Sequence, residues 1–150
     1  MTKSFADAVG EWARESESRL ERVWQVAVGD LATEMSRTEK DGGKVPHVTG
    51  NLANSLLAST AGVPAQGGPK DEYKPPGVDA GALAAMLKLG DTVWLGYRAV
   101  YARRLNYGFV GEDSLGRTYN QTGRQFVEHA IEQWPQIVQG AAAKVKGGES

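Results

Sequence analysis

The sequence has no cysteine, which excludes a disulfide framework, a thiolate nucleophile and a thiolate metal site. It also lacks any run of about eighteen apolar residues, the length that a membrane-spanning helix needs. Seventeen basic and eighteen acidic side chains leave a formal charge of −1, so no overall field attracts nucleic acid or an anionic membrane. The amino-terminal stretch lacks the apolar core of a signal peptide. We therefore expect a soluble protein that is made and used in the cytoplasm.

Patterns that indicate catalysis or metal binding are scarce as well. His47 and His129 are the only histidines, and their spacing does not place two ligands on one helix face. Glu128 and Glu132 lie one turn apart on the polar side of a predicted helix, where solvated charge is the ordinary outcome. The glycines form no phosphate-binding pattern. The sequence thus predicts a protein that is not an enzyme, with no catalytic, cofactor-binding or metal-binding residue.

A long amphipathic helix is the clearest feature that is present. Apolar residues recur at threes and fours from Ser4 to about Met35, with charged residues on the other side. Ser4 and Asp7 form a weakened capping signal at its start. Roughly thirty residues is about twice the ordinary helix length, so we expect one end to lean on something outside its own domain, such as another subunit. The chain of 150 residues suits a single domain.

The stretch from Thr92 to Gly108 changes its period from two to about 3.6. It predicts a strand over Thr92 to Tyr97, followed by a short helix that Gly108 closes in a left-handed conformation. The helix places its apolar residues on one face and Arg103 and Arg104 away from it. That face comprises Val100, Tyr101, Leu105 and Phe109.

The segment from Gly62 to Gly81 holds five glycines and four prolines and shows no apolar periodicity. Such a loop gains little from local hydrogen bonds or burial, so we expect something outside the chain to order it. Tyr73 is its only aromatic residue and is therefore the expected anchor. Before the loop, a short turn capped by Thr49 or Asn51 leads into a strand that runs from Leu56 to Val63.

Weaker signals complete the chain. A short helix over Ala80 to Leu89 is preferred to a simple approach to the next strand. Glycine and polar residues between Gly111 and Gly123 indicate a second loop. A closing helix begins at about Arg124, is interrupted by Pro135, and ends before a solvated tail, Lys146 to Ser150.

The order of these pieces resembles the tail-completion or head–tail joining (neck) protein family of long-tailed bacteriophages and gene transfer agents. The likeness spans about Ser4 to Val145. In this chain Leu105-Asn106-Tyr107-Gly108 stands where an acidic residue commonly precedes the closing glycine. The residues that carry the likeness are Thr49, Gly50, Leu52, Ser55, Val93, Gly96, Tyr101, Ala102, Gly108, Phe126 and Ala130.

The resemblance implies an α+β fold with a long amino-terminal helix, a small curved antiparallel sheet, flanking helices and a carboxy-terminal helix. It also implies a structural virion protein, assembled in the host cytoplasm as a ring, with six subunits as the expected number. Such a ring joins the head connector or stopper to the tail terminator or tail tube. DNA passes through its channel without sequence-specific binding. A tail terminator ring remains an alternative within the same particle.

The segment from Arg98 to Tyr107 mixes arginines with tyrosines, a combination that can stack on bases and hold phosphates. The same residue types are enriched at protein interfaces, and we favour an interface with a neighbouring subunit or the channel. A free-standing nucleic-acid-binding module is the alternative from another class. The candidate interface residues are Tyr73, Arg98, Tyr101, Arg103, Arg104 and Tyr107.

Overall fold

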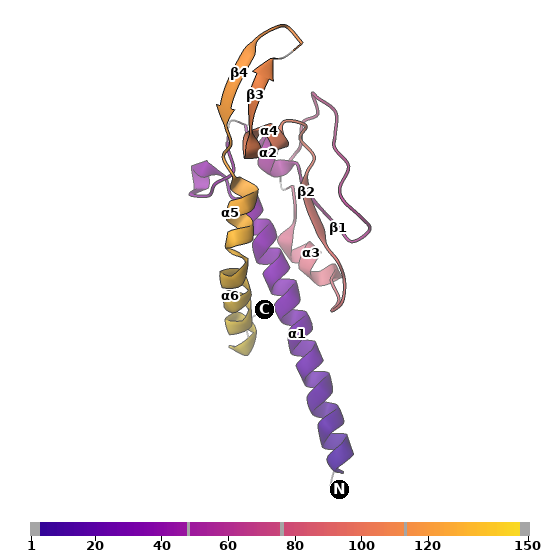
Figure 1. The fold of residues 1–150 in the computed structure, drawn as a ribbon. Coiled ribbons are helices and arrows are strands. Elements are labelled where there is room, and N and C mark those ends of the chain that lie inside the picture. The colour runs from indigo at the N-terminus through magenta and orange to yellow at the C-terminus, as the bar shows by residue number, and fades with distance from the viewer. Residues whose placement is uncertain (1–3, 48, 76, 113, 148–150) are drawn as a thin grey trace.

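The long first helix organises the computed structural model, which describes residues 4–47, 49–75, 77–112 and 114–147. Helix α1 spans Phe5–Ser36, and the Ser4 hydroxyl accepts a hydrogen bond from the backbone N–H of Asp7 at 3.1 Å. Both the predicted helix and its cap are confirmed. The carboxy-terminal half of α1 lies among the other elements, whereas its amino-terminal half extends beyond them (Figure 1).

Two carboxy-terminal helices, α5 (Phe126–Glu132) and α6 (Trp134–Lys146), run beside α1 (Figure 1). The predicted interruption of the closing helix at Pro135 is confirmed: α5 ends and α6 begins as a new helix. Pro135 lies in the first turn of α6, where a backbone N–H has no partner within the helix, so its missing N–H costs no hydrogen bond. The indole rings of Trp24 and Trp134 meet edge to face, with 6.5 Å between their centroids. Of the expected tail, residues 148–150 lie outside the described residues.

A two-stranded antiparallel sheet, β1 (Leu56–Ser59) and β2 (Trp94–Tyr97), covers another side of α1. Leu56 pairs with Tyr97, and Leu95 and Tyr97 pack on the core that α1 lines. The strand expected over Leu56 to Val63 ends early, because the Ser59 hydroxyl accepts hydrogen bonds from the N–H groups of Ala61 and Gly62 and turns the chain.

The preferred helix after the long loop is confirmed as α3 (Ala80–Met86), which packs against α1 (Figure 1). The Asp79 carboxylate caps it by accepting from the N–H of Ala82 at 3.0 Å. It ends before the expected Leu89, because the backbone of Leu87 is extended and its side chain is buried with Leu83.

The prediction of a loop between Gly111 and Gly123 is wrong. Gly108 follows α4 (Ala102–Tyr107) with a positive φ of +86°, but its ψ of 173° is extended and not the predicted left-handed conformation. It turns the chain into a hairpin of β3 (Gly108–Glu112) and β4 (Thr118–Thr122). Phe109 accordingly belongs to β3 and not to the helix face. The hairpin projects from the molecule, and every residue of β4 is exposed (Figure 1). A strand without a buried face carries no apolar alternation, so its sequence reads as loop.

Two short elements complete the described chain: a 3₁₀ turn at Glu39–Asp41 and α2 at Asn51–Asn54. The expected cap by Thr49 or Asn51 is wrong, because Gly50 is the N-cap of α2 and no described side chain caps the helix. The Thr49 hydroxyl accepts from the N–H of Asn51 at 3.3 Å just before it. The described residues thus form a long amino-terminal helix, two small antiparallel sheets, flanking helices and a carboxy-terminal helix. This arrangement confirms the expected α+β class.

Candidate assembly interface

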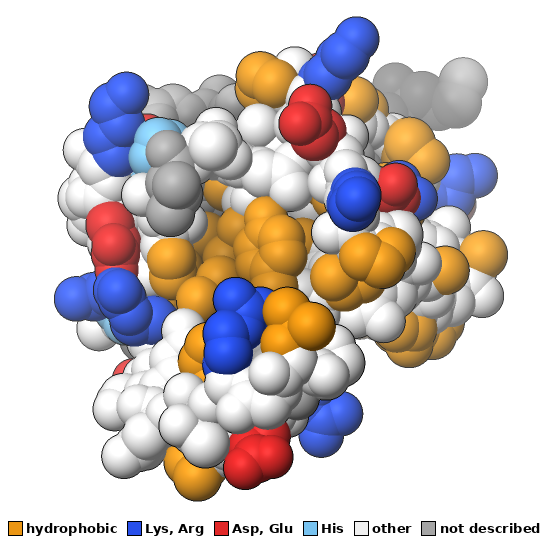
Figure 2. Space-filling model, turned by 90° about the horizontal axis from the view of Figure 1, so that it is seen from above, with side chains coloured by type: hydrophobic (Ala, Val, Ile, Leu, Met, Phe, Trp, Pro, Cys, Tyr) orange, Lys and Arg blue, Asp and Glu red, His pale blue; other side chains and the backbone are white. Residues whose placement is uncertain are grey.

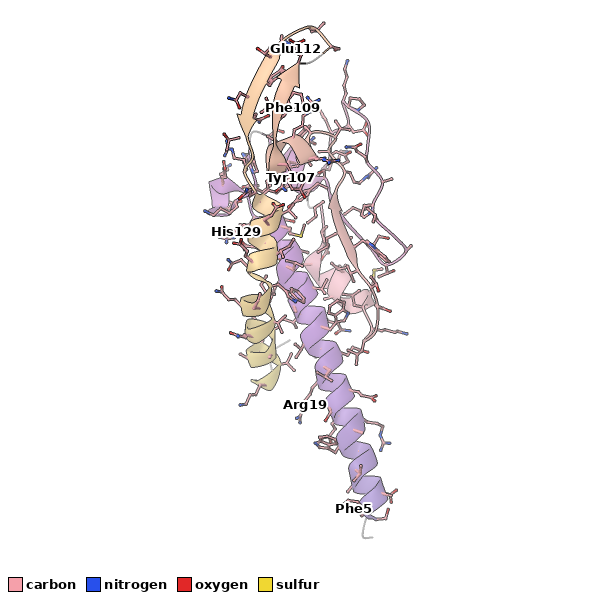
Figure 3. All side chains as sticks on the ribbon, in the orientation of Figure 1. Phe5, Arg19, Tyr107, Phe109, Glu112 and His129 are labelled. Carbon is pink, nitrogen blue, oxygen red and sulfur yellow. The ribbon has the colours of Figure 1, made fainter. Side chains whose placement is uncertain are left out.

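The amino-terminal half of α1, residues 5–20, forms a surface that we call the arm. Its large apolar side chains are exposed to an extent that is unusual for a monomer: Phe5 is 86%, Trp12 69% and Leu20 57% exposed. Val9 is 45% exposed. The side-chain view shows Phe5 and Arg19 on the part of α1 that extends beyond the other elements (Figure 3).

These apolar side chains fall on one side of α1 at 3.6 residues per turn, in line with Val23 and Asp30. That side is covered by α6 further along, since Val23 lines a hollow with Ala142 and Val145, and Lys144 binds Asp30 at 3.1 Å. Beyond the end of α6, no described residue covers the same side of the arm. The arm therefore carries the apolar face of a packed helix without a packing partner.

Charge on the arm is mostly negative. Four acidic residues of the arm, Asp7, Glu11, Glu15 and Glu17, outnumber its two basic residues, Arg14 and Arg19. When the positions are projected at 3.6 residues per turn, Glu17 lies on one edge of the apolar side, and Arg19 and Glu15 lie on the other. A partner of the arm would therefore be apolar in its centre and basic along the Glu17 edge.

The predicted interface residues divide into two groups in the structure. Tyr73, Arg98 and Tyr101 lie together: the Arg98 guanidinium stands 5.4 Å from the centroid of the Tyr73 ring. Asn51 joins the group through its Nδ2 group, which donates to the Tyr101 hydroxyl at 2.9 Å, while its Oδ1 accepts from the N–H of Tyr73 at 2.6 Å.

The other three predicted residues lie on α4. Arg103 and Arg104 are exposed, as predicted, and Tyr107 is 66% exposed. The Arg104 guanidinium lies 3.9 Å from the centroid of the Phe109 ring, at the base of the hairpin. We call the exposed side chains of Tyr101, Arg103, Arg104 and Tyr107 the α4 face.

The expectation that something outside the chain must order the long loop is wrong. The N–H of Gly67 donates to the carbonyl of Arg98 at 2.9 Å, and Asn51 Nδ2 donates to the carbonyl of Asp71 at 3.3 Å. Tyr73 is the anchor, as expected, but it packs within its own chain against the buried cluster around Phe126. Because the loop lies along β2 and α2, contacts distant in sequence supply what local periodicity does not. Pro76 lies outside the described residues.

A notch of about 150 Å³ adjoins the α4 face. Its apolar walls include Pro46, Leu52 and Leu105, with Tyr101 and Arg124 beside them. Seen from above, the molecule has a hollow with hydrophobic side chains on its floor and both basic and acidic side chains around it (Figure 2). The notch thus lies on the Tyr101 and Leu105 side of α4, whereas Arg103 and Arg104 place exposed positive charge on the other side of the same short helix.

Two asparagines hold these surfaces in place through contacts that the sequence analysis did not predict, although it named Asn51 as a candidate cap. Asn51 ties α2 to the loop, and Asn106, which is 2% exposed, ties α4 to α5. Neither residue belongs to a motif, and their contacts join positions about twenty residues or more apart. The one available signal is a polar residue inside an apolar helical pattern, as Asn106 stands beside Leu105.

Among the described residues, no cluster of three or more His, Asp or Glu side chains could hold a metal ion. None of the described helices is long and apolar enough to cross a membrane. Comparison of the chain with family models, curated proteins and solved structures finds no match.

Proposed function

We propose that this chain is a structural subunit that assembles into a ring through its arm, of the kind that joins head and tail at the neck of a long-tailed phage. The exposure of Phe5, Val9, Trp12 and Leu20 on one side of the arm carries the proposal. Aromatic and aliphatic side chains of this size, gathered on one side of a helix, are anchors that binding buries.

The residues that carry the family resemblance support the fold on which the proposal depends. Leu52, Ser55, Phe126 and Ala130 are each 3% exposed or less, and Gly108 takes the positive φ that an L-residue disfavours. These positions fix the core and one turn. The neck function itself rests on the order of the motifs together with the exposed arm.

The partners follow from the same proposal. A neck ring contacts further copies of itself, a head connector or stopper protein on one side, and a tail terminator or tail tube protein on the other. DNA passes through its channel, and a chain of net charge −1 exerts no strong overall grip on phosphate. The assembled location is the neck of the virion. No enzymatic step belongs to this role.

A free-standing nucleic-acid-binding module fits the geometry less well. Modules of this kind offer exposed aromatic faces on which bases stack. Here the Tyr73 ring is covered by Arg98, and the Phe109 ring is covered by Arg104. Of the tyrosines between Arg98 and Tyr107, Tyr107 is 66% exposed, whereas Tyr101 is 36% exposed and its hydroxyl is held by Asn51.

Native mass spectrometry over a concentration series tests the proposal. The wild-type chain should form one closed oligomer, and Trp12→Asp should shift the population to monomer. Met86→Asp is the matched control, because Met86 is 69% exposed, as Trp12 is, but lies on α3. A wild-type chain that stays monomeric and shifts DNA strongly at low salt would favour the nucleic-acid module instead.

A further inference from the structure

We infer that the arm of one copy binds the α4 face and its notch on a second copy of the same chain. This inference rests on the proposed ring assembly and names the surface that the arm occupies. It commits to a second copy because the two surfaces complement each other in both charge and shape.

Charge is the first match. Between Asp91 and Glu112 the sequence has no acidic residue but three arginines, Arg98, Arg103 and Arg104. No carboxylate of the described residues forms an ion pair with them. The arm has a net negative charge, with Glu17 at one edge of its apolar side and Glu15 beside Arg19 at the other. Unlike charges at the rim steer association and select the register of the partner.

Shape is the second match. A recess of about 150 Å³ has the volume of an engineered cavity that admits a benzene ring. The walls contributed by Pro46, Leu52 and Leu105 are apolar. One aromatic side chain therefore fits the notch, and Trp12 is the best placed, since it lies on the exposed apolar side three residues before Glu15.

A second apolar hollow is a poorer receptor for the arm. It has a volume of about 270 Å³ and lies between Trp24, Leu95 and Trp134, with the exposed Ile131 among its walls. Ile131 is followed by Glu132, which is exposed and acidic. Bringing the acidic arm there would place like charges together, which disfavours docking.

The arm cannot reach the α4 face of its own chain. Phe5 lies at one end of the molecule and Tyr107 and Phe109 lie toward the other (Figure 3). The contact is therefore between different surfaces of two copies, a heterologous contact. Repetition of such a contact closes into a ring when the rotation between copies permits it and otherwise grows as a filament.

Mixing two defective variants tests this inference. Trp12→Asp has a damaged arm but an intact α4 face, and the double variant Arg103→Glu/Arg104→Glu has a damaged face but an intact arm. Each alone should lose self-association by about tenfold or more. Their mixture should give a one-to-one heterodimer, because one arm and one face remain complementary. The control Lys40→Glu/Lys88→Glu makes the same change of charge at exposed positions elsewhere.

The outcomes separate this inference from the proposed ring. A mixture that gives no heterodimer, or an Arg103→Glu/Arg104→Glu variant that assembles as the wild type does, overturns the contact even if wild-type rings form. A heterodimer from the mixture, with wild-type chains that form dimers or filaments, supports the contact and overturns the ring. A chain that stays monomeric at every concentration overturns both.

Disulfide trapping gives an independent measurement, because the sequence contains no cysteine. Oxidation of a mixture of Glu15→Cys and Thr49→Cys subunits should give a covalent dimer, since Thr49 lines the notch. Lys88→Cys in place of Thr49→Cys is the control and should give at least tenfold less. Equal yields from both mixtures would contradict the proposed contact.

Discussion

Asn106 and Glu128 join the base of the hairpin to the first turn of α5. The Asn106 amide nitrogen donates to both Glu128 carboxylate oxygens, at 3.1 and 2.8 Å, and its amide oxygen accepts from the N–H of Val127 at 2.9 Å. Asn106 is buried, so all three bonds lie in a poorly solvated setting where an unmade bond is costly. The contact fixes the α4 face relative to the rest of the fold.

Replacement of Asn106 by Asp should destabilise the fold by about 2–4 kcal/mol, since a carboxylate there cannot donate to Glu128 and repels it. Chemical denaturation at neutral pH measures the loss. Adding Glu128→Gln to Asn106→Asp restores a donor between the two side chains and should recover a large part of the stability. A double variant that is no more stable than Asn106→Asp would contradict the assigned bond.

Asn51→Ala should release the long loop, because it removes the bonds to Tyr73, Asp71 and Tyr101. Trypsin cleavage after Lys70 should then be at least several-fold faster than in the wild type. Asn54→Ala in the same short helix is the control and should leave the rate unchanged. Equal cleavage of the wild type and Asn51→Ala would show that Asn51 does not order the loop.

Leu95→Asp should cost about 2–5 kcal/mol, because Leu95 packs against the core beside Met35 and a carboxylate there would lose its water. Leu57→Asp tests the other face of the same sheet, since Leu57 is 39% exposed and lies opposite Gly96. Leu57→Asp should lower the free energy of unfolding much less than Leu95→Asp does. Thermal melting compares the two variants, and equal losses would remove Leu95 from the core.

Tyr97 gives the fold a dependence on alkaline pH. Its hydroxyl donates to the carbonyl of Met35 at 2.7 Å, and burial raises the pKa of Tyr97 above the ordinary value of about 10. Because the folded-state pKa is the higher one, the stabilisation is complete below about pH 10 and is lost as the pH rises toward the folded-state pKa.

Tyr97→Phe should therefore lose about 1 kcal/mol at neutral pH and show a shallower decline of stability above about pH 10 than the wild type. Urea denaturation at a series of pH values compares the two slopes. Parallel curves across that range would show that Tyr97 ionises as freely in the folded state as in the unfolded chain.

The sequence predicted the elements whose periodicity or capping is local. Alternation predicted the strand β2, which begins at Trp94 and not at the expected Thr92. The recurrence of apolar residues every three or four positions predicted α1, and Pro135 predicted the interruption between α5 and α6. The need for glycine with a positive φ at position 108 was also predictable from the end of the helix, although its backbone is extended there and not left-handed. Each of these features depends on residues within a few positions of one another.

Features that depend on distant contacts were not predictable. The hairpin lacks a buried face, and the loop is ordered by β2 and α2, which are far from it in sequence. Gly123 is a further example: a Cβ there would lie 2.5 Å from the carbonyl oxygen of Asn106, so the close approach of two segments selects glycine. Of the candidate interface, sequence reasoning predicted the exposed arginines of α4 but not the notch beside them.

Electron microscopy of the purified wild-type chain tests the central claim most directly. The account predicts closed rings of one size with a central channel, formed at neutral pH and moderate salt, and their loss in Trp12→Asp but not in Met86→Asp. Single copies, or open filaments without closed rings, would contradict the claim that this chain is a ring-forming subunit.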